Sequence, residues 1–572
     1  MKNHGNNLNN VNLTENKYSK KKIIVTSALP YANGEIHIGH IVSTYLPADI
    51  FTRYNKLKRN RIIHICATDD FGTPILIRAE EEHKTPEEYV GHWFNRDLKD
   101  FKDIGICFDI FSQTSSDMNI KIAQHFFKKL HDNGYIYKKN ISQYFCTNDN
   151  KFLPDRYVIG KCPFCNALEQ YSDGCEKCGR IFNNNEILDP KCIICKEQPK
   201  FRDTEHYFFR LSKFSDKLEN WLTNNSNLHS EIKNYVLNWI KNGLNDWDIT
   251  RDIKWGIPIP ISNINNKVLY GWFENHLCYI SSVLSYFSDK NEDGKEFWNS
   301  SDIYHFIGKD IVYHHYLFLP AMRMGVNQEY KLPDFIPVRG HLKLENQKIS
   351  KSRGWYISLR EFIDSFNPDY LRYYCSSITP NNQKDVNFSW NEFKIKINNE
   401  LVANVGNFIN RTLTFINSKY NGNIPEPKNF DSQDKIFISK INSIAKKVEI
   451  KIQANDIDKA LRTIMEFSSY CNQYFQSRTP WKEETNSVNT IYLCFNAVKT
   501  LAIILKPYLP FTISKLLKNI NLDEKELEWD DANKMNIKSQ HKIMRTEILF
   551  NKVTEDEIEL QKNKHKNTEN IQ

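Results

Sequence analysis

The chain has 572 residues, and its 77 Lys and Arg against 69 Asp and Glu give a formal net charge of +8. This length is enough for three to five domains at roughly 100–200 residues each, and an apolar share of 40% excludes a disordered chain. No run of about 18 apolar residues occurs, and residues 1–20 lack the apolar core of a secretory signal. We therefore expect a cytoplasmic protein with no membrane-spanning segment.

The residues that follow this leader predict a parallel α/β sheet. Ile23–Ala28 and Ile62–Ala67 are short apolar runs typical of buried strands, and between them the apolar residues of Ile38–Leu57 recur on one helical face. Strand, long helix and strand form a βαβ unit, so the sheet should be parallel with a right-handed crossover. The pattern resumes with a predicted strand over Val268–Phe273 and a helix from Asp310.

Two regions differ from this pattern. Residues 130–245 hold a cysteine cluster among irregular polar stretches, which indicates an insertion, and residues 395–550 are mostly helix-periodic, with loops at Asn421–Pro427 and Ser477–Pro480. We predict an α/β + α fold, in which an insertion splits a Rossmann-type parallel sheet and a helical domain follows. The predicted boundaries are 1–20 for a disordered leader, 21–129 and 246–345 for the two halves of the sheet domain, 130–245 for the insertion, 346–394 for a linker region, 395–550 for the helical domain and 551–572 for a flexible tail.

The cysteines of the insertion are spaced as metal ligands. Cys162-x-x-Cys165 is followed after nine residues by Cys175-x-x-Cys178, and two such hairpins supply four thiolates for tetrahedral Zn²⁺. Crowded cysteines in a chain without an export signal favour metal ligation over disulfides. We expect a zinc-bearing insertion whose metal is structural, because all four coordination positions are filled and none is left for water.

Two basic segments are candidates for binding a polyphosphate. His37-Ile38-Gly39-His40 opens the first helix, where unpaired N–H groups and the helix dipole favour an anion, and Gly39 leaves room for a nucleotide. Lys348-Ile349-Ser350-Lys351-Ser352-Arg353-Gly354 offers three cations and two hydroxyls as a mobile clamp. Each segment taken alone is more typical of ordinary surface polarity, so their conjunction carries the prediction.

Six motifs identify a family resemblance. They are ALPYANGEIHIGH (Ala28–His40), ICATDDFGTP (Ile65–Pro74), FLPDR (Phe152–Arg156), WDITRD (Trp247–Asp252), FIGKDIVY (Phe306–Tyr313) and KISKSRG (348–354). With these motifs in this order, the chain resembles the methionyl-tRNA synthetases, a family of class I aminoacyl-tRNA synthetases. The motifs occur in the family's order, and the resemblance covers nearly all of residues 22–550. The resemblance implies ATP-dependent activation of an amino acid, followed by its transfer to the terminal adenosine of a tRNA. It makes residues 395–550 an anticodon-binding domain.

The resemblance assigns roles at the phosphate site. His37, His40 and Lys351 would stabilise the phosphate charge of the transition state, with Lys348 assisting, Gly39 beside the ATP and Mg²⁺ bridging the phosphates. Such catalysis consists mostly of positioning and charge neutralisation and needs no side-chain nucleophile. Arg251 would lie at the entrance of the active site.

The amino-acid pocket matches the family only in part. The residues that keep the pattern are Leu29, Pro30, Tyr31, Asp69, Trp272, Tyr279, Ile311 and His315, with Asp69 placed to hold the ammonium group. Those that depart from it are Asn275, His276, His314, where an aromatic ring is usual, and Leu319, where Trp is usual. Either the polar side chains of Asn275, His276 and His314 bond to each other and to surrounding groups, or the true substrate is more polar than methionine or differently shaped.

A second metal site would need Cys192-x-x-Cys195 and two further ligands. Related enzymes use another Cys-x-x-Cys near the FLPDR segment, where this chain has Cys146 followed by Asp149. Asp149 could replace the thiolate and give a weaker site, or this knuckle is metal-free.

Asn407 and Arg411 lie four residues apart on one helix face, and Trp481 follows Pro480 in a break between helices. By themselves these residues are compatible with a polar helix face and a Trp that caps the bundle. By resemblance all three match positions that read the CAU anticodon of methionine tRNA through edge bonds and stacking.

The leading hypothesis is therefore a monomeric enzyme that attaches methionine to its tRNA through a methionyl-adenylate, with ATP, Mg²⁺ and Zn²⁺. One alternative is a divergent paralogue that activates another amino acid or serves a biosynthetic pathway. The other is a non-catalytic tRNA-binding protein.

Overall fold

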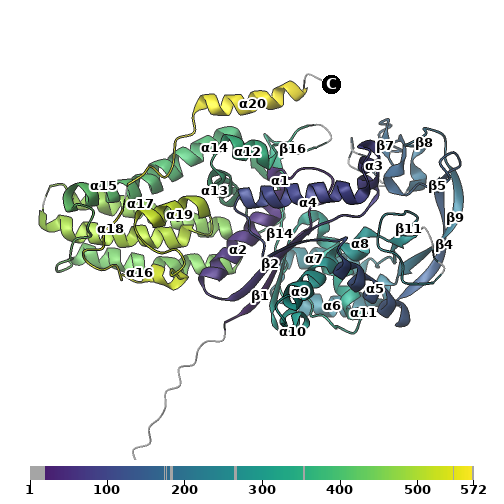
Figure 1. The fold of residues 1–572 in the computed structure, drawn as a ribbon, viewed down its shortest axis with the longest axis horizontal. Coiled ribbons are helices and arrows are strands. Elements are labelled where there is room, and N and C mark those ends of the chain that lie inside the picture. The colour runs from purple at the N-terminus through teal and green to yellow at the C-terminus, as the bar shows by residue number, and fades with distance from the viewer. Residues whose placement is uncertain are drawn as a thin grey trace, which may run out of the picture.

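The computed structural model describes residues 20–569, apart from 173, 176, 179, 181–183, 263, 265–266, 352–353, 483 and 545. The predicted disordered leader, up to residue 19, lies outside the described residues, as do Ser352 and Arg353 of the basic clamp. Figure 1 shows a helical bundle, an α/β body and a β-rich lobe in a row.

The α/β body is built on one parallel sheet, as predicted. Its strands run in the order β14-β13-β1-β2-β3, and each neighbouring pair is parallel. The bounds are β1 Lys22–Ser27, β2 Arg61–Thr68, β3 Ile110–Gln113, β13 Asp302–Gly308 and β14 Val338–Arg339. Strand β1 pairs with β13, although the insertion lies between them in the sequence. The insertion therefore divides the sheet into two halves, as expected.

Both faces of this sheet are covered. Ile23 and Val25 of β1 face the helix α2 (Leu46–Leu57), whereas Ile24 between them packs on the opposite face with α9 (Cys278–Ser288). Side chains alternate across a strand, so a strand buried on both faces is apolar throughout, which is the pattern that identified β1. The helices α3 (Thr73–Glu81), α4 (Pro86–Asp103), α5 (Asp117–Asp132) and α10 (Gly294–Ser300) and the turn α1 (Ile38–His40) complete this body.

The predicted strand over Val268–Phe273 is wrong beyond its first two residues. Only Val268–Leu269 is extended, as β12 paired with β11 (Thr250–Arg251), and Gly271–Glu274 forms the short helix α8. Phe273 is buried by a helical turn instead, in which its N–H donates to the Tyr270 carbonyl at 2.8 Å. A short apolar run does not by itself distinguish these two states.

The insertion is a β-rich lobe. A long antiparallel ribbon of β4 (Ile136–Cys146) and β9 (Lys200–Phe209) leads to a three-stranded sheet, and the chain returns through α6 and α7. The remaining bounds are β5 Lys151–Phe152, β6 Val158–Lys161, β7 Gln170–Tyr171, β8 Leu188–Cys192, α6 Ser215–Asn224, α7 Ser230–Lys241 and β10 Trp247–Asp248. The ribbon carries the cysteine knuckles away from the parallel sheet.

The C-terminal half begins with a small sheet and becomes entirely helical. Bounds are β15 Leu342–Leu344, β16 Gln347–Lys348, β17 Val386–Phe388, α11 Leu319–Gly325, α12 Leu359–Ser365, α13 Pro368–Ile378, α14 Trp390–Lys396, α15 Asn407–Tyr420, α16 Ser432–Gln453, α17 Ile457–Arg478, α18 Glu484–Leu505 and α19 Pro510–Asn519. The gaps after α15 and α17 match the predicted loops. One hydrophobic core runs from the α2 face of the sheet into this bundle, so the two parts are packed together.

Helix α18 is long and apolar enough, by length and composition, to cross a membrane over Ser487–Leu505. However, 94% of that window is buried inside the protein. The apolar character of α18 is that of a central helix surrounded by its neighbours in the bundle.

The C-terminal tail differs from the predicted flexible segment. Residues Glu555–Glu569 form the helix α20, and Ile558 and Gln561 are buried against the body. The Gln561 amide donates to Ser365 Oγ at 3.0 Å, and Lys394 pairs with Glu555. A few anchoring contacts thus order a segment whose composition is strongly polar.

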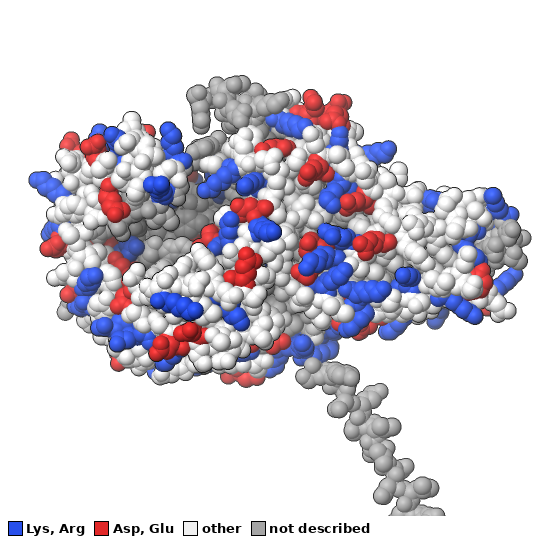
Figure 2. Space-filling view, turned by 180° about the vertical axis from the view of Figure 1, so that it is seen from behind, with Lys and Arg blue, Asp and Glu red and all other residues white. Residues whose placement is uncertain are grey.

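On the face shown in Figure 2, basic and acidic side chains are interspersed.

Candidate active site

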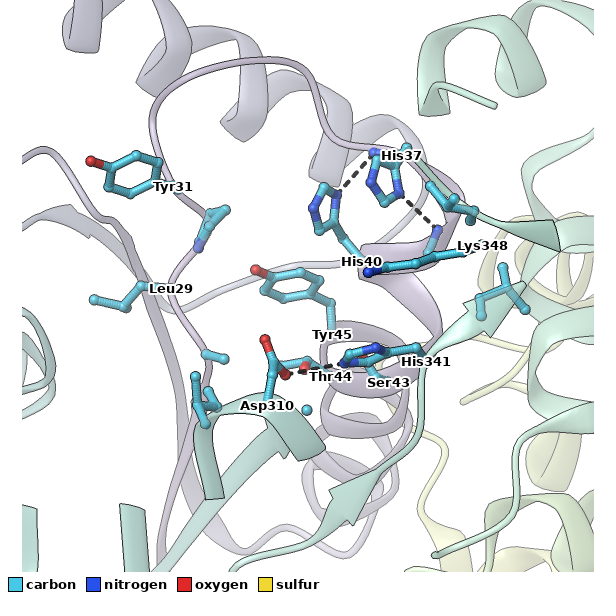
Figure 3. A pocket seen from close by; sticks show the side chains of 17 residues that line it. Leu29, Tyr31, His37, His40, Ser43, Thr44, Tyr45, Asp310, His341 and Lys348 are labelled. Carbon is cyan, nitrogen blue, oxygen red and sulfur yellow. Dashed lines mark hydrogen bonds and ion pairs between the residues drawn. The ribbon is translucent and has the colours of Figure 1, made fainter. Parts of the chain in front are cut away.

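A cavity of about 360 Å³ lies beyond the carboxyl ends of β1 and β13 (Figure 3). Its lining comes from four parts of the chain: Ala28–Tyr31, the His37–Tyr45 turn, Gly308–Ile311 and His341–Ile349. Ligands of open parallel sheets bind at this edge. The two basic segments, more than 300 residues apart in sequence, therefore meet at one cavity.

The two histidines of the first turn are held as a stacked pair. Their ring centroids are 3.7 Å apart; His37 Nδ1 accepts the Gly39 N–H, and His40 Nδ1 accepts the His37 N–H, both at 3.1 Å. Burial lowers the pKa of His37 to about 3 and that of His40 well below its usual value, and the Lys351 charge acts in the same direction. Both rings are then neutral with Nδ1 as acceptor, so the proton sits on Nε2 as a donor.

The glycine between the histidines is required by packing. A side-chain carbon added at Gly39 would lie 2.9 Å from His37 Cε1 and 3.0 Å from Ile349 Cδ1. The room at Gly39 thus lets the clamp segment approach the first turn, in addition to any room it leaves for a nucleotide.

The two lysines of the clamp differ in their relation to the cavity. Lys348 lines the cavity and Lys351 does not. The Lys351 ammonium is beside Gly34, where an added side-chain carbon would be 3.4 Å from Nζ. Burial lowers the pKa of Lys351, while Asp97 and Glu35 raise it. Lys348, which was expected only to assist, therefore lines the cavity, whereas Lys351, which was expected to stabilise the transition-state phosphate, does not.

Asp69 lies directly after β2, as predicted. Its Oδ2 accepts from the Asn275 amide at 3.1 Å, and its Oδ1 is buried with no hydrogen-bond partner among the described residues. Burial, with a further contribution from Asp70, raises the pKa of Asp69 to about 7. A buried acceptor with one open oxygen suits an ammonium group. Asn275, one of the departures from the family pattern, thus has a defined partner.

The raised pKa predicts a pH dependence. Below about pH 7 the Asp69 carboxyl is protonated and cannot pair with an ammonium, so the KM for the amino acid should rise as the pH falls through this range. Amino-acid-dependent ATP–pyrophosphate exchange, measured across this range, reads the KM directly. The Asp69→Asn variant should have a high KM that no longer varies with pH; a wild-type KM that stays constant would contradict the assignment.

The other predicted pocket residues form one group. Leu29, Tyr31 and Ile311 line the cavity. Behind them His315 Nδ1 donates to the Ile311 carbonyl at 3.1 Å, and its Nε2 accepts from the Tyr279 hydroxyl at 3.3 Å. Trp272 lies beside this group, with its ring centroid 5.1 Å from that of His314. The predicted set is therefore contiguous.

The cavity also contains residues that the sequence did not single out. Ser43, Thr44 and Tyr45 line it from the turn after α1, and Asp310 pairs with His341 at 3.3 Å. Asp310 follows the carboxyl end of β13, so the rule that singled out Asp69 could have identified it. Arg251 lies on β11, with its guanidinium 3.7 Å from the Tyr270 ring centroid.

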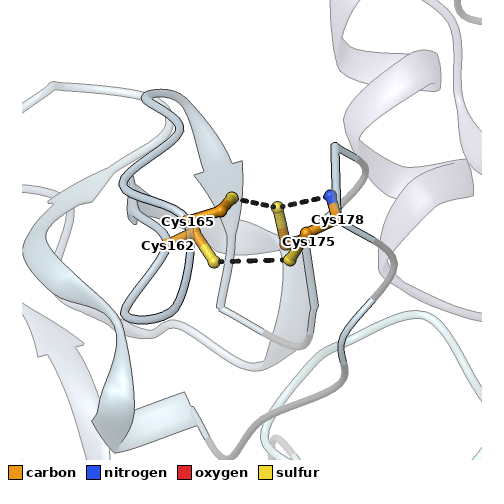
Figure 4. A group of neighbouring side chains, drawn as sticks. All are labelled: Cys162, Cys165, Cys175 and Cys178. Atoms are coloured by element: carbon orange, nitrogen blue, oxygen red, sulfur yellow. Dashed lines mark hydrogen bonds between the residues drawn. The ribbon is translucent and has the colours of Figure 1, made fainter.

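The first predicted metal knuckle has the geometry of a zinc site (Figure 4). The Sγ atoms of Cys162, Cys165, Cys175 and Cys178 all lie within 4.8 Å of one another. Cys162 and Cys178 are 3.9 Å apart, and Cys165 and Cys175 are 3.5 Å apart. Four sulfurs at about 2.3 Å from a tetrahedral Zn²⁺ have a similar spacing, roughly 3.8 Å. The residues present therefore fit this metal.

The structure also brings together the second set. Cys146, Asp149, Cys192 and Cys195 form a cluster of the same kind. Asp149 Oδ2 is 3.1 Å from the Sγ atoms of both Cys146 and Cys192, and Cys146 and Cys195 are 3.4 Å apart. The carboxylate thus occupies the place of the fourth thiolate.

Two of the three predicted anticodon residues lie on helix α15, and the third, Trp481, lies in the turn between α17 and α18. Asn407 and Arg411 of α15 line a shallow groove opposite α17, where Asn407 donates to Asn472 at 3.1 Å and Arg411 donates to Gln476 at 3.0 Å. The Arg411 guanidinium is 5.9 Å from the Trp481 ring centroid, and 46% of Trp481 is exposed. An amide, a guanidinium and an exposed indole are therefore adjacent on one surface.

Comparisons with known proteins identify the family of this chain. The family model "tRNA synthetases class I (M)" matches residues 23–413, and "Anticodon binding domain of methionyl tRNA ligase" matches residues 424–570. A methionine–tRNA ligase of Methanobrevibacter smithii is 43% identical, over 95% of this chain and 82% of the relative. One of Pyrococcus furiosus is 40% identical, over 94% of this chain and 76% of the relative.

Among solved structures, the Mycobacterium tuberculosis methionyl-tRNA synthetase in complex with methionyl-adenylate superposes with a TM-score of 0.77. The match is 21% identical and covers 93% of this chain and 99% of that one, so it supports the fold. The family model spans more than half of the chain, and relatives near 40% identity match over almost all of it. The chain therefore belongs to the methionine branch of the class I aminoacyl-tRNA synthetases.

Proposed function

We propose that this protein attaches methionine to tRNA(Met) in an ATP-dependent reaction through a methionyl-adenylate intermediate. The observation that carries this proposal is the meeting of His37, His40 and Lys348 at one cavity beyond the strand ends. The names of the relatives support the choice of methionine and its tRNA.

In the first step a carboxylate oxygen of methionine attacks the α-phosphorus of ATP, and pyrophosphate leaves. The Nε2–H groups of His37 and His40 are fixed before the reaction and donate to phosphate oxygens as their charge grows. Lys348, which lines the cavity, would neutralise charge on the triphosphate, and Lys351, beside Gly34, would add to the positive charge near it. Mg²⁺ carried on the ATP would neutralise part of the remaining phosphate charge.

Asp69 would hold the methionine ammonium beside Tyr31, whose backbone forms a bridge with that of Asp69. Leu29, Trp272, Tyr279, Ile311 and His315 would surround the side chain. The pair of Tyr279 and His315 is already hydrogen-bonded, so its orientation costs nothing further when the substrate arrives.

Zinc would be structural at Cys162, Cys165, Cys175 and Cys178, since all four ligand positions are protein thiolates. A second ion at Cys146, Asp149, Cys192 and Cys195 would be held by a mixed set, and we expect weaker binding there.

The zinc assignment predicts a stoichiometric loss. The Cys162→Ser variant should contain one zinc fewer per chain than the wild type and unfold at a lower temperature, because the metal supplies folding free energy to its knuckle. Metal analysis of the purified proteins measures this. Cys107→Ser, at an exposed cysteine outside both clusters, serves as the matched control. Equal zinc contents in all three proteins would refute the site.

For the RNA, Asn407, Arg411 and Trp481 would read the CAU anticodon in the groove between α15 and α17. We also propose that the protein acts as a monomer in the cytoplasm.

ATP–pyrophosphate exchange with each of the twenty amino acids tests the proposal. Methionine-dependent exchange supports it, and exchange with another amino acid favours the divergent paralogue. No exchange with any amino acid, in a protein that still binds tRNA, favours the non-catalytic binding protein.

A further inference from the structure

Four histidine rings form a buried group behind the amino-acid pocket: His276, His305, His314 and His315. The centroid of His276 is 4.3 Å from that of His314 and 4.4 Å from that of His315, and His305 is 5.8 Å from His315. All four rings are at most 3% exposed. Since His276 also lies 5.5 Å from Tyr279, this group borders the residues proposed to surround the methionine side chain.

Two of these rings have complete hydrogen bonding. His305 Nδ1 bonds to Thr26 Oγ1 at 2.6 Å, and its Nε2 accepts from Arg323 at 3.4 Å. His315 is bonded at both nitrogens, to the Ile311 carbonyl and the Tyr279 hydroxyl. Their tautomers are thereby fixed, and neither can offer a new bond without losing an old one.

The other two rings differ. The Nδ1 atoms of His276 and His314 are buried without a hydrogen-bond partner in the described part of the chain, and their rings face each other at 41° without bonding. Burial lowers the pKa of both far below its usual value, with neighbouring imidazoles adding to the effect, so both are neutral. A neutral imidazole always keeps one N–H, and in either tautomer the buried Nδ1 of these two rings is a polar atom left without a partner, which is destabilising.

The electrostatics of the group favour an electronegative ligand atom. Arg323, buried next to His305, donates to the Lys331 carbonyl at 3.2 Å, and its guanidinium stacks on Trp298. It forms no ion pair with a carboxylate among the described residues, and burial lowers its pKa to about 9. This positive charge without a counter-charge extends its field over the neighbouring neutral rings.

We propose that His276 and His314 are specificity-determining residues that allow the pocket to accept methionine sulfoxide as well as methionine. The inference rests on the proposed function, because it uses the same amino-acid pocket. A thioether sulfur is a weak acceptor that cannot satisfy an N–H group, whereas the sulfoxide oxygen is a strong one. Leu319, where the family pattern has Trp, is also the smaller side chain at its position.

The chemistry of activation is the same for both substrates. The carboxylate attacks the α-phosphorus and pyrophosphate leaves, while the sulfoxide group takes no part in bond making. The difference lies in the pocket, where a donor that pairs with a substrate acceptor discriminates more strongly than apolar contacts do.

ATP–pyrophosphate exchange of the wild type with methionine, methionine sulfoxide and norleucine tests the proposal. Norleucine has a similar length and no acceptor, so we expect kcat/KM for the sulfoxide to exceed that for norleucine. In His314→Phe, which supplies the aromatic ring usual in the family, kcat/KM for the sulfoxide should fall about tenfold. The value for methionine should change much less. His314→Gln, which keeps an N–H donor, should retain part of the sulfoxide activity.

His125→Phe, at a partly exposed histidine bonded to Glu329, is the matched control and should change neither substrate. Retained exchange with methionine shows that each variant is folded. If His314→Phe is inactive with methionine, His276→Gln and His276→Leu supply the same donor comparison. A wild type active with methionine but no better with the sulfoxide than with norleucine overturns this inference alone. A wild type inactive with methionine overturns the proposed function.

Discussion

Replacing His40 with Asn is expected to slow methionine-dependent ATP–pyrophosphate exchange about 10²–10³-fold, mostly in kcat. His40 Nδ1 accepts the His37 N–H, and its Nε2–H remains to meet the phosphate. The Asn side chain can keep the first bond but ends too early for the second. Because the lost donor acts on charge that develops in the transition state, KM for ATP and methionine should change far less.

His40→Gln provides the complementary measurement. Its amide nitrogen reaches approximately the position of Nε2, so it should recover part of the lost rate, while Asn should not. Thermal unfolding of both variants verifies that the buried first turn remains intact. Equal rates for Asn, Gln and wild type would show that the imidazole Nε2–H does not contact the reacting phosphate.

Replacing Trp481 with Ala should lower kcat/KM for charging of methionine tRNA about 10–100-fold and leave pyrophosphate exchange unchanged. An exposed indole next to a guanidinium offers a stacking surface, and each stacked base contributes about 1–3 kcal/mol. Because Trp481 does not line the cavity, activation without tRNA should not sense the change. Aminoacylation and exchange assays on the same preparation separate the two effects.

Trp481→Phe keeps a smaller ring and should lose less activity than Trp481→Ala. Trp481→Ala should also discriminate less between tRNA transcripts with a CAU anticodon and transcripts with an altered one. The reason is that the substitution removes contacts with the anticodon bases. If charging by Trp481→Ala equals that of the wild type, Trp481 is a cap of the bundle, as its sequence context alone would allow.

The parallel sheet was predictable because its strands are buried on both faces, which leaves an uninterrupted apolar run such as Ile23–Ala28. The structure confirms strands at 22–27 and 61–68 with a helical crossover between them. The strand predicted at Val268–Phe273 was wrong beyond Leu269. A short apolar run does not distinguish a strand from a helical turn, and here such a turn buries Phe273. The tail was mispredicted because composition does not reveal the few contacts, such as that of Ile558, that fix α20.

The candidate site was predictable to a similar extent. Residue spacing identified the two cysteine clusters, and the structure places both within ligand distance. The motifs also located both basic segments at the sheet edge. They did not reveal that Lys348 rather than Lys351 lines the cavity, nor that Asn275 bonds to Asp69. These relations depend on side-chain positions across segments separated by more than 200 residues.

The sequence by itself determined the βαβ unit of the parallel sheet, the metal-ligand spacing and the two basic segments proposed to bind phosphate, because each is encoded within a few neighbouring positions. Only the tertiary structure decided which polar groups are paired. The Asp69 Oδ1 and the Nδ1 atoms of His276 and His314 are buried, and the charge and hydrogen bonding of such groups depend on which partners other segments supply.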